Sequence, residues 1–250
     1  TDWHWSKLTR MIEFVGKPFY NPIAYRLAPD YMRRYSEPYS SRSAYYNDPV
    51  RAEKMKNFMV FRSSPMDKHG FFNLGPENSF HSSGVEMADH VIVEVTKDMP
   101  VCMGGAEEAV HISRISHIVE DPNNTPLFAP DPMEPTDVER QIAEHVVKHI
   151  VDGACLQLGI GGMPNAIGKM IADSDIRDLG CHTEMFVDTY LDMYEAGKLT
   201  NAVKPVDRHR SAYTFAIGSR KLYDFLHLNS AVASYPVDYT NDPSIIKSID

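Results

Sequence analysis

Two apolar stretches in the first half of the chain have the pattern of buried strands. Residues 56–64, KNFMVFRSS, and residues 90–95, HVIVEV, carry apolar side chains on both faces. That pattern is typical of strands covered on both sides, as in a parallel sheet. Residues 79–89, which precede the second run, predict a short crossover helix, although Gly84 weakens its helical propensity.

The second half opens with the period of an amphipathic helix. Thr136 and Glu139 have the spacing of a capping box, and the pattern ends near Gly153. Apolar residues recur every four positions, with two more beside them: Val138, Ile142, Val146 and Ile150, then Ala143 and Val147. We therefore expect a helix with one apolar face from residue 136 to about residue 150.

A strand–turn–helix–strand order follows this helix. Residues 154–160, ACLQLGI, predict a strand, Gly161-Gly162 a tight turn, and residues 164–175 a helix with Pro164 in its first turn. A further strand leads to residues 180–185, GCHTEM. This order is the βαβ arrangement of an open parallel sheet. Ligand-binding and catalytic sites in such sheets lie at the carboxyl ends of the strands.

Between the two halves lies a proline-rich stretch, residues 121–135, DPNNTPLFAPDPMEP, with five prolines. Each proline fixes φ and removes a backbone donor, so a helix or a central strand is not expected there. We interpret it as an inter-domain linker that separates residues 1–120 from residues 136–250.

Composition narrows the class of protein. The 250 residues are 43% hydrophobic, enough for a sizeable core, and the formal net charge of −9 disfavours nucleic acid or an anionic membrane as partner. The three cysteines, Cys102, Cys155 and Cys181, lack the spacing of a disulfide framework or a zinc site. Neither a signal peptide nor a run of about 18 apolar residues is apparent, so we expect a soluble, cytoplasmic protein without metal.

The first candidate site is the glycine segment 159–165, GIGGMPN. Glycines at a strand-to-helix turn let a ligand approach the backbone and present free N–H groups to an anion. The segment lacks the Lys-Ser/Thr of a phosphate-binding loop and the spacing of a dinucleotide fingerprint. A tight turn without a ligand is therefore at least as consistent with these residues as a binding loop.

The second candidate is His182-Thr183-Glu184-Met185. A strand would place His182 and Glu184 on the same face and could expose a carboxylate at the sheet end. A deaminase also uses H-x-E, but its P-C-x-x-C partner is missing from this chain. The pattern alone favours a solvated or hydrogen-bonded surface acid at position 184.

A resemblance to a known family favours a catalytic role for Glu184 over that of a surface acid. Residues 156–201, from LQLGIGGMPN through GCHTEMFVDTY to AGKLTN, resemble the most diagnostic block of the acetyl-CoA hydrolase/transferase family, which includes butyryl-CoA:acetate and 4-hydroxybutyrate CoA-transferases. The segments SPMDKHGFFNLGP, ADHVIVEVTKDMP, WHWSKLTRMI and PVDYTNDPSII continue the likeness over nearly the whole chain.

The resemblance implies a fold and a mechanism. We expect an α/β fold with two open, mainly parallel-sheet domains of the CoA-transferase (NagB/RpiA-like) type, and a homo-oligomer. Glu184, in the family's H-[ST]-E-M motif, is then the nucleophile that attacks an acyl-CoA thioester and forms a glutamyl-CoA thioester in ping-pong chemistry. Coenzyme A is a substrate, and no permanently bound cofactor is required. The implied binding residues flank that glutamate and form the glycine loop: Gly159, Gly161, Gly162, Met163, Pro164, Asn165, His182 and Thr183.

Family members begin earlier and continue well past Asp250, so we expect both domains to be incomplete here. Butyryl-CoA or a similar short-chain acyl-CoA, with acetate as acceptor, is the substrate pair that the resemblance suggests. Two alternatives stay open: an acyl-CoA hydrolase, in which water resolves the intermediate, and a non-catalytic fragment that needs the missing C-terminal half.

Overall fold

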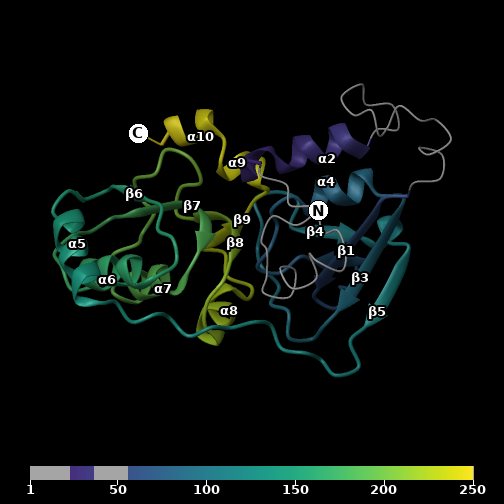
Figure 1. The fold of residues 1–250 in the computed structure, drawn as a ribbon, viewed down its shortest axis with the longest axis horizontal. Helices are drawn as coiled ribbons and strands as arrows, with labels where there is room; N and C mark the ends of the chain where they lie inside the picture. The colour runs from purple at the N-terminus through teal and green to yellow at the C-terminus, as the bar shows by residue number, and fades with distance from the viewer. Residues whose placement is uncertain (1–22, 37–55, 250) are drawn as a thin grey trace, which may run out of the picture.

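The computed structural model describes residues 23–36 and 56–249, which form two lobes lying side by side (Figure 1). We call residues 56–120 the N-terminal lobe and residues 137–249 the C-terminal lobe. Each lobe contains a parallel sheet, which confirms the predicted α/β fold class. The segment WHWSKLTRMI, quoted for the resemblance, lies outside the described residues.

The N-terminal lobe is built on a parallel sheet of order β1-β3-β5, and an antiparallel pair, β2 and β4, lies beside it. The strands and the helix expected within residues 56–64, 79–89 and 90–95 are confirmed. Only one face of β1 is buried, however, because Phe58 and Val60 are each 62% exposed. The elements are β1 (Phe58–Ser63), β2 (Phe71–Asn73), α4 (His81–Met87), β3 (His90–Val95), β4 (Ala109–His111), η2 (Ile112–Arg114) and β5 (His117–Glu120).

The C-terminal lobe contains a four-stranded parallel sheet of order β6-β7-β8-β9. Helices α6 and α7 lie on one side of β7, and α9 lies on the other (Figure 1). The elements are α5 (Asp137–Val147), β6 (Cys155–Leu156), α6 (Gly162–Ala172), β7 (Gly180–Phe186), α7 (Asp188–Glu195), β8 (Ser211–Ala216), α8 (Arg220–Leu226), β9 (Val232–Ser234), α9 (Val237–Thr240) and α10 (Pro243–Lys247).

The strand expected over residues 154–160 is much shorter than predicted. Pairing with β7 ends at Leu156, and the N–H of Leu158 donates to the hydroxyl of Tyr190 (2.6 Å) instead of to a strand. The predicted Gly161-Gly162 turn is also wrong in detail. Gly161, at φ +123°, is the N-cap of α6, and Gly162 is already the first residue of the helix.

Helix α5 starts as expected, because the Thr136–Glu139 capping box is present with both of its reciprocal hydrogen bonds. The predicted apolar face is confirmed only in part. Val138 is 65% exposed and Ile142 is 44% exposed, whereas Ala143 is fully buried and Val147 and Ile150 pack against the core. The buried edge of the helix is therefore displaced by one position from the four-residue repeat.

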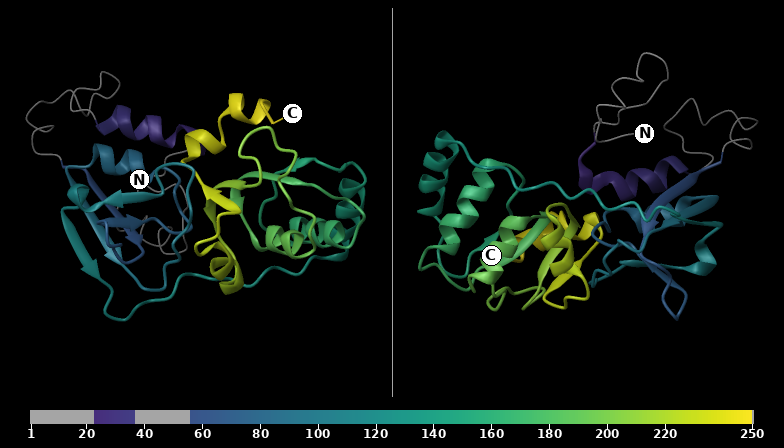
Figure 2. Two further views of the ribbon diagram at one scale, coloured as in Figure 1. Left: turned by 180° about the vertical axis from the view of Figure 1, so that it is seen from behind. Right: turned by 90° about the horizontal axis from the view of Figure 1, so that it is seen from below.

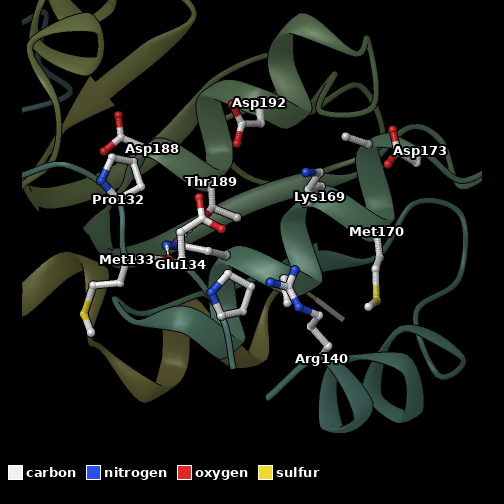
Figure 3. A pocket seen from close by; sticks show the side chains of 14 residues that line it. Pro132, Met133, Glu134, Arg140, Lys169, Met170, Asp173, Asp188, Thr189 and Asp192 are labelled. Atoms are coloured by element: carbon white, nitrogen blue, oxygen red, sulfur yellow. Dashed lines mark hydrogen bonds between the residues drawn. The ribbon is translucent and has the colours of Figure 1, made fainter. Parts of the chain in front are cut away.

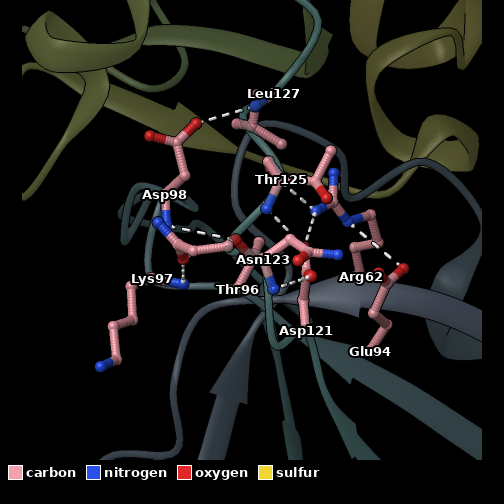
Figure 4. A network of polar contacts seen from close by, with 10 residues as sticks. Arg62, Glu94, Thr96, Lys97, Asp98, Asp121, Asn123, Thr125 and Leu127 are labelled. Carbon is pink, nitrogen blue, oxygen red and sulfur yellow. Dashed lines mark hydrogen bonds and ion pairs between the residues drawn. The ribbon is translucent and has the colours of Figure 1, made fainter.

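The linker, residues 121–135, contains no regular element and runs along one edge of the molecule from β5 to α5 (Figure 1). A network of polar contacts ties it to the N-terminal lobe (Figure 4). Arg62 donates to the carbonyl of Thr125 (2.9 Å) and pairs with Asp121 (3.4 Å), and the Asp98 carboxylate accepts from the N–H of Leu127 (2.8 Å). The linker is therefore bound along its length to folded structure.

The two lobes also contact each other directly, as all views show (Figures 1 and 2). Cys102, which precedes the linker, packs in the core of the C-terminal lobe. Asp98 pairs with Arg220 across the junction (2.5 Å). The N-terminal segment η1 (Tyr25–Leu27) and α2 (Ala28–Ser36) lies across the junction beside α4 and α9.

Candidate active site

Glu184 lies on β7, the second strand of the C-terminal sheet, and its side chain is partly buried. Successive side chains on a strand point to opposite faces. His182 and Glu184 both contact the segment 240–241 on one face, which confirms the predicted arrangement. Thr183 points to the opposite face, where its hydroxyl donates to the carbonyl of Met185 (2.9 Å).

Asn241 holds the Glu184 carboxylate. Its Nδ2 donates to Oε2 of Glu184, and its Oδ1 accepts from the hydroxyl of Thr240 (3.2 Å). Sequence reasoning missed this residue. It lies in PVDYTNDPSII, where it immediately precedes Asp242, the N-cap of α10, and no local pattern links it to a strand 57 residues away.

Tyr25 brings the N-terminal segment to the same place. Its hydroxyl donates to the hydroxyl of Ser79 (2.7 Å), and its ring packs edge-on against Phe80 and Phe215. Burial raises the pKa of Tyr25 strongly, and the negative charges of Glu77 and Glu184 raise it further. Tyr25 therefore stays protonated at neutral pH, close enough to Glu184 to interact with its charge.

A cavity of about 820 Å³ opens between the two lobes at this point. Met185, which follows Glu184 on β7, lines the cavity on the C-terminal lobe together with Phe215 and Ile217 at the carboxyl end of β8, whereas Glu184 itself is not among the lining residues. The wall on the N-terminal lobe includes three polar or charged side chains, Arg62, Glu77 and His81. Tyr25, from the N-terminal segment described above, also lines the cavity.

The glycine segment divides between two places. Ile160 lines the inter-lobe cavity, and Gly159 has open space where a side chain would begin. Gly162 is buried against this chain itself, since a Cβ there would lie 2.8 Å from Cα of Pro135 and 2.6 Å from the Glu139 carboxylate. Its need for a glycine therefore comes from packing.

Met163, Pro164 and Asn165 belong to the first turns of α6, and Asn165 does not line the inter-lobe cavity. It lines a second pocket of about 580 Å³ between the linker, α5, α6 and α7 (Figure 3). There the Asn165 amide donates to the carbonyl of Met133 (2.8 Å) and accepts from the hydroxyl of Thr189 (2.8 Å). Both contacts pin α6 to its neighbours.

Two further properties of the described residues bear on the class of site. Within residues 23–36 and 56–249, no three His, Cys, Asp or Glu side chains are placed to hold a metal ion. No helix in these ranges combines the length and apolar character needed to cross a membrane.

Known proteins share this architecture. The RipA structure from Yersinia pestis matches 97% of this chain and 52% of its own at 34% identity, with a TM-score of 0.79. The 4-hydroxybutyrate CoA-transferase structure from Porphyromonas gingivalis matches 94% of this chain and 54% of its own at 29% identity, with a TM-score of 0.77. The fold is therefore that of CoA-transferases.

The sequence comparisons agree with the structural ones. The family model described as the acetyl-CoA hydrolase/transferase N-terminal domain matches residues 44–129. The butyryl-CoA:acetate CoA-transferase of Anaerostipes caccae is 46% identical over 99% of this chain and 52% of its own length. The chain belongs to the acetyl-CoA hydrolase/transferase family, and it spans about half the length of the curated relatives it matches.

Proposed function

We propose that the protein transfers coenzyme A between a short-chain acyl-CoA, such as butyryl-CoA, and a carboxylate such as acetate, with Glu184 as the covalent nucleophile. The observation that carries this proposal is the position of Glu184. The Glu184 carboxylate is oriented by Asn241, and the next residue on the same strand, Met185, lines a cavity between the two lobes, in a chain 46% identical to a butyryl-CoA:acetate CoA-transferase.

The site suits a carboxylate nucleophile. In water a carboxylate attacks a thioester poorly, so catalysis requires that it be ionised, partly desolvated and aimed. Glu184 is partly buried, and the Asn241 amide restrains one of its oxygens. The apolar walls formed by Met185, Phe215 and Ile217 suit a short acyl chain and disfavour water.

The proposed reaction conserves the thioester bond. Glu184 attacks the acyl carbonyl and expels CoA thiolate, which leaves a mixed anhydride. The thiolate then attacks the glutamyl carbonyl, so that the donor acid departs as its carboxylate and a glutamyl-CoA thioester remains. The acceptor carboxylate reverses both steps, which restores ionised Glu184 and gives the new acyl-CoA. No oxidant or reductant is consumed.

Borohydride trapping tests the proposal, because it reduces a glutamyl thioester to an alcohol. Full-length protein is incubated with butyryl-CoA and then borohydride, and the peptide containing HTEM is examined by mass spectrometry. We expect Glu184 to be converted to the alcohol only when acyl-CoA is present. Glu184→Gln should abolish labelling and lower transfer by about 10³-fold or more, and Glu184→Asp should lower it by about 10²-fold.

Glu77 provides the matched control, since its carboxylate lines the inter-lobe cavity and, like Glu184, its charge acts on Tyr25. Glu77→Gln should keep the label on Glu184. A label on Glu77, or wild-type transfer by Glu184→Gln, contradicts the assignment of the nucleophile. Turnover of butyryl-CoA without any added acceptor acid would instead identify a hydrolase.

A further inference from the structure

His182 has a buried contact that the chemistry of Glu184 does not require. The residue is 5% exposed, and its Nε2 lies 2.8 Å from the carbonyl oxygen of Thr240. A carbonyl can only accept, so Nε2 must carry the hydrogen. Nδ1 is buried and has no hydrogen-bond partner among the described residues. His182 is therefore the neutral Nε2–H tautomer, and it donates to the Thr240 carbonyl.

The surroundings of His182 keep it neutral. Burial lowers the pKa of the imidazole, and the nearby Lys204 ammonium lowers it further, while the bond to Thr240 and the Asp207 carboxylate act in the opposite direction. The ring of Tyr239 lies beside it, with 6.0 Å between ring centroids. A second proton on Nδ1 would be buried without an acceptor.

The acceptor of this hydrogen bond, the Thr240 carbonyl, lies at the end of a helix. Thr240 is the last residue of α9 and is 2% exposed, so its carbonyl lies at a buried helix end, where a donor is needed. The next residue is Asn241, which donates to Glu184. His182 and Glu184, two positions apart on β7, thus hold the backbone and the side chain of one short segment.

We propose that His182 is a positioning residue for the transfer reaction: its Nε2–H anchors the Thr240 carbonyl and thereby keeps the Asn241 amide on the Glu184 carboxylate. This inference rests on the proposed function. In this role His182, the histidine of the HTEM motif, does not contact the substrate. Misplacement of a catalytic group by about 1 Å can lower a rate by about 10²-fold, so the anchor bears on kcat.

Three substitutions separate this role from general packing. Glutamine can place an amide N–H near the position of Nε2, asparagine is too short to do so, and leucine has no donor. In full-length protein we expect His182→Leu and His182→Asn to lower kcat by about 10- to 100-fold, with KM for butyryl-CoA changed by less than about threefold. His182→Gln should recover most of the activity.

A double-mutant cycle with Asn241→Ala tests whether His182 affects kcat through Asn241. Because His182 acts through Asn241, His182→Leu should lower kcat by less than about twofold further in the Asn241→Ala background. Multiplicative losses would overturn the inference, as would wild-type kcat in His182→Leu. If His182→Leu does not fold, the pair of His182→Gln and His182→Asn decides, and equal losses in both refute the role.

An independent readout is the tautomer. Nitrogen-15 NMR of the wild-type protein should show His182 protonated at Nε2 and bare at Nδ1 at neutral pH, and the opposite tautomer overturns the inference. The wild-type assays distinguish the two proposals. Absence of acceptor-dependent transfer and of borohydride labelling defeats the proposed function, whereas normal transfer with no effect at position 182 defeats only the positioning role.

Discussion

Gly162→Ala provides the sharpest test of why the glycine segment has its sequence. The added Cβ would lie 2.8 Å from the backbone Cα of Pro135, and 2.6 Å and 2.9 Å from Oε2 and Cδ of Glu139. Real Cβ atoms do not approach that closely, so the chain must shift. Oε2 of Glu139 cannot simply swing away, because it accepts from the N–H and the hydroxyl of Thr136 in the capping box (2.7 and 2.8 Å).

The expected cost has two parts. Displacing Glu139 from the capping box costs about 0.5–2 kcal/mol, and overpacking against Pro135 costs about 1–3 kcal/mol. Alanine's better helix propensity returns less than about 1 kcal/mol. We therefore expect a net loss of about 2–3 kcal/mol, and since each kcal/mol lowers Tm by roughly 2–4 °C in a chain of this size, a decrease of roughly 5–10 °C.

Gly159→Ala is the matched control, because no atom lies within 4 Å of the Cβ it would add. Its stability should change by less than about 0.5 kcal/mol. Thermal melts and urea titrations of both variants, with unchanged m-values, provide the comparison. If Gly162→Ala melts within a degree of the wild type, or if Gly159→Ala is the less stable variant, the packing argument fails.

Two further predictions concern the linker. The Thr125 N–H holds the pKa of Asp121 below its ordinary value, so the stability from ionised Asp121 is present above its unfolded-state pKa of about 3.9 and is lost as pH falls through the lower folded-state pKa. Asp121→Asn should therefore weaken the protein at pH 7 and flatten its acid unfolding below about pH 4; an unchanged acid transition contradicts this. Arg220→Ala should cost less than about 1 kcal/mol because Arg220 is half exposed. Asp98→Ala should cost about 1–3 kcal/mol because it also leaves the Leu127 N–H without its acceptor; equal urea midpoints for the two variants would refute that difference.

Local patterns in the sequence determined much of this protein. A capping box depends on residues three apart, so Thr136 and Glu139 predicted the start of α5 correctly. The alternation of side chains along a strand predicted that His182 and Glu184 share a face. The resemblance assigned Glu184 a role that spacing alone did not support.

Tertiary structure decided the rest, because the remaining features depend on which distant segments meet. Asn241 reaches Glu184 across 57 residues, and Tyr25 approaches the same carboxylate from the other end of the chain. Only part of the apolar face predicted for α5 is buried, on the side that carries Ala143, because the sequence pattern does not encode which neighbouring elements pack against the helix. The close packing of Gly162 against Pro135 could not be read from the glycine segment, because only the folded chain brings those two backbones together.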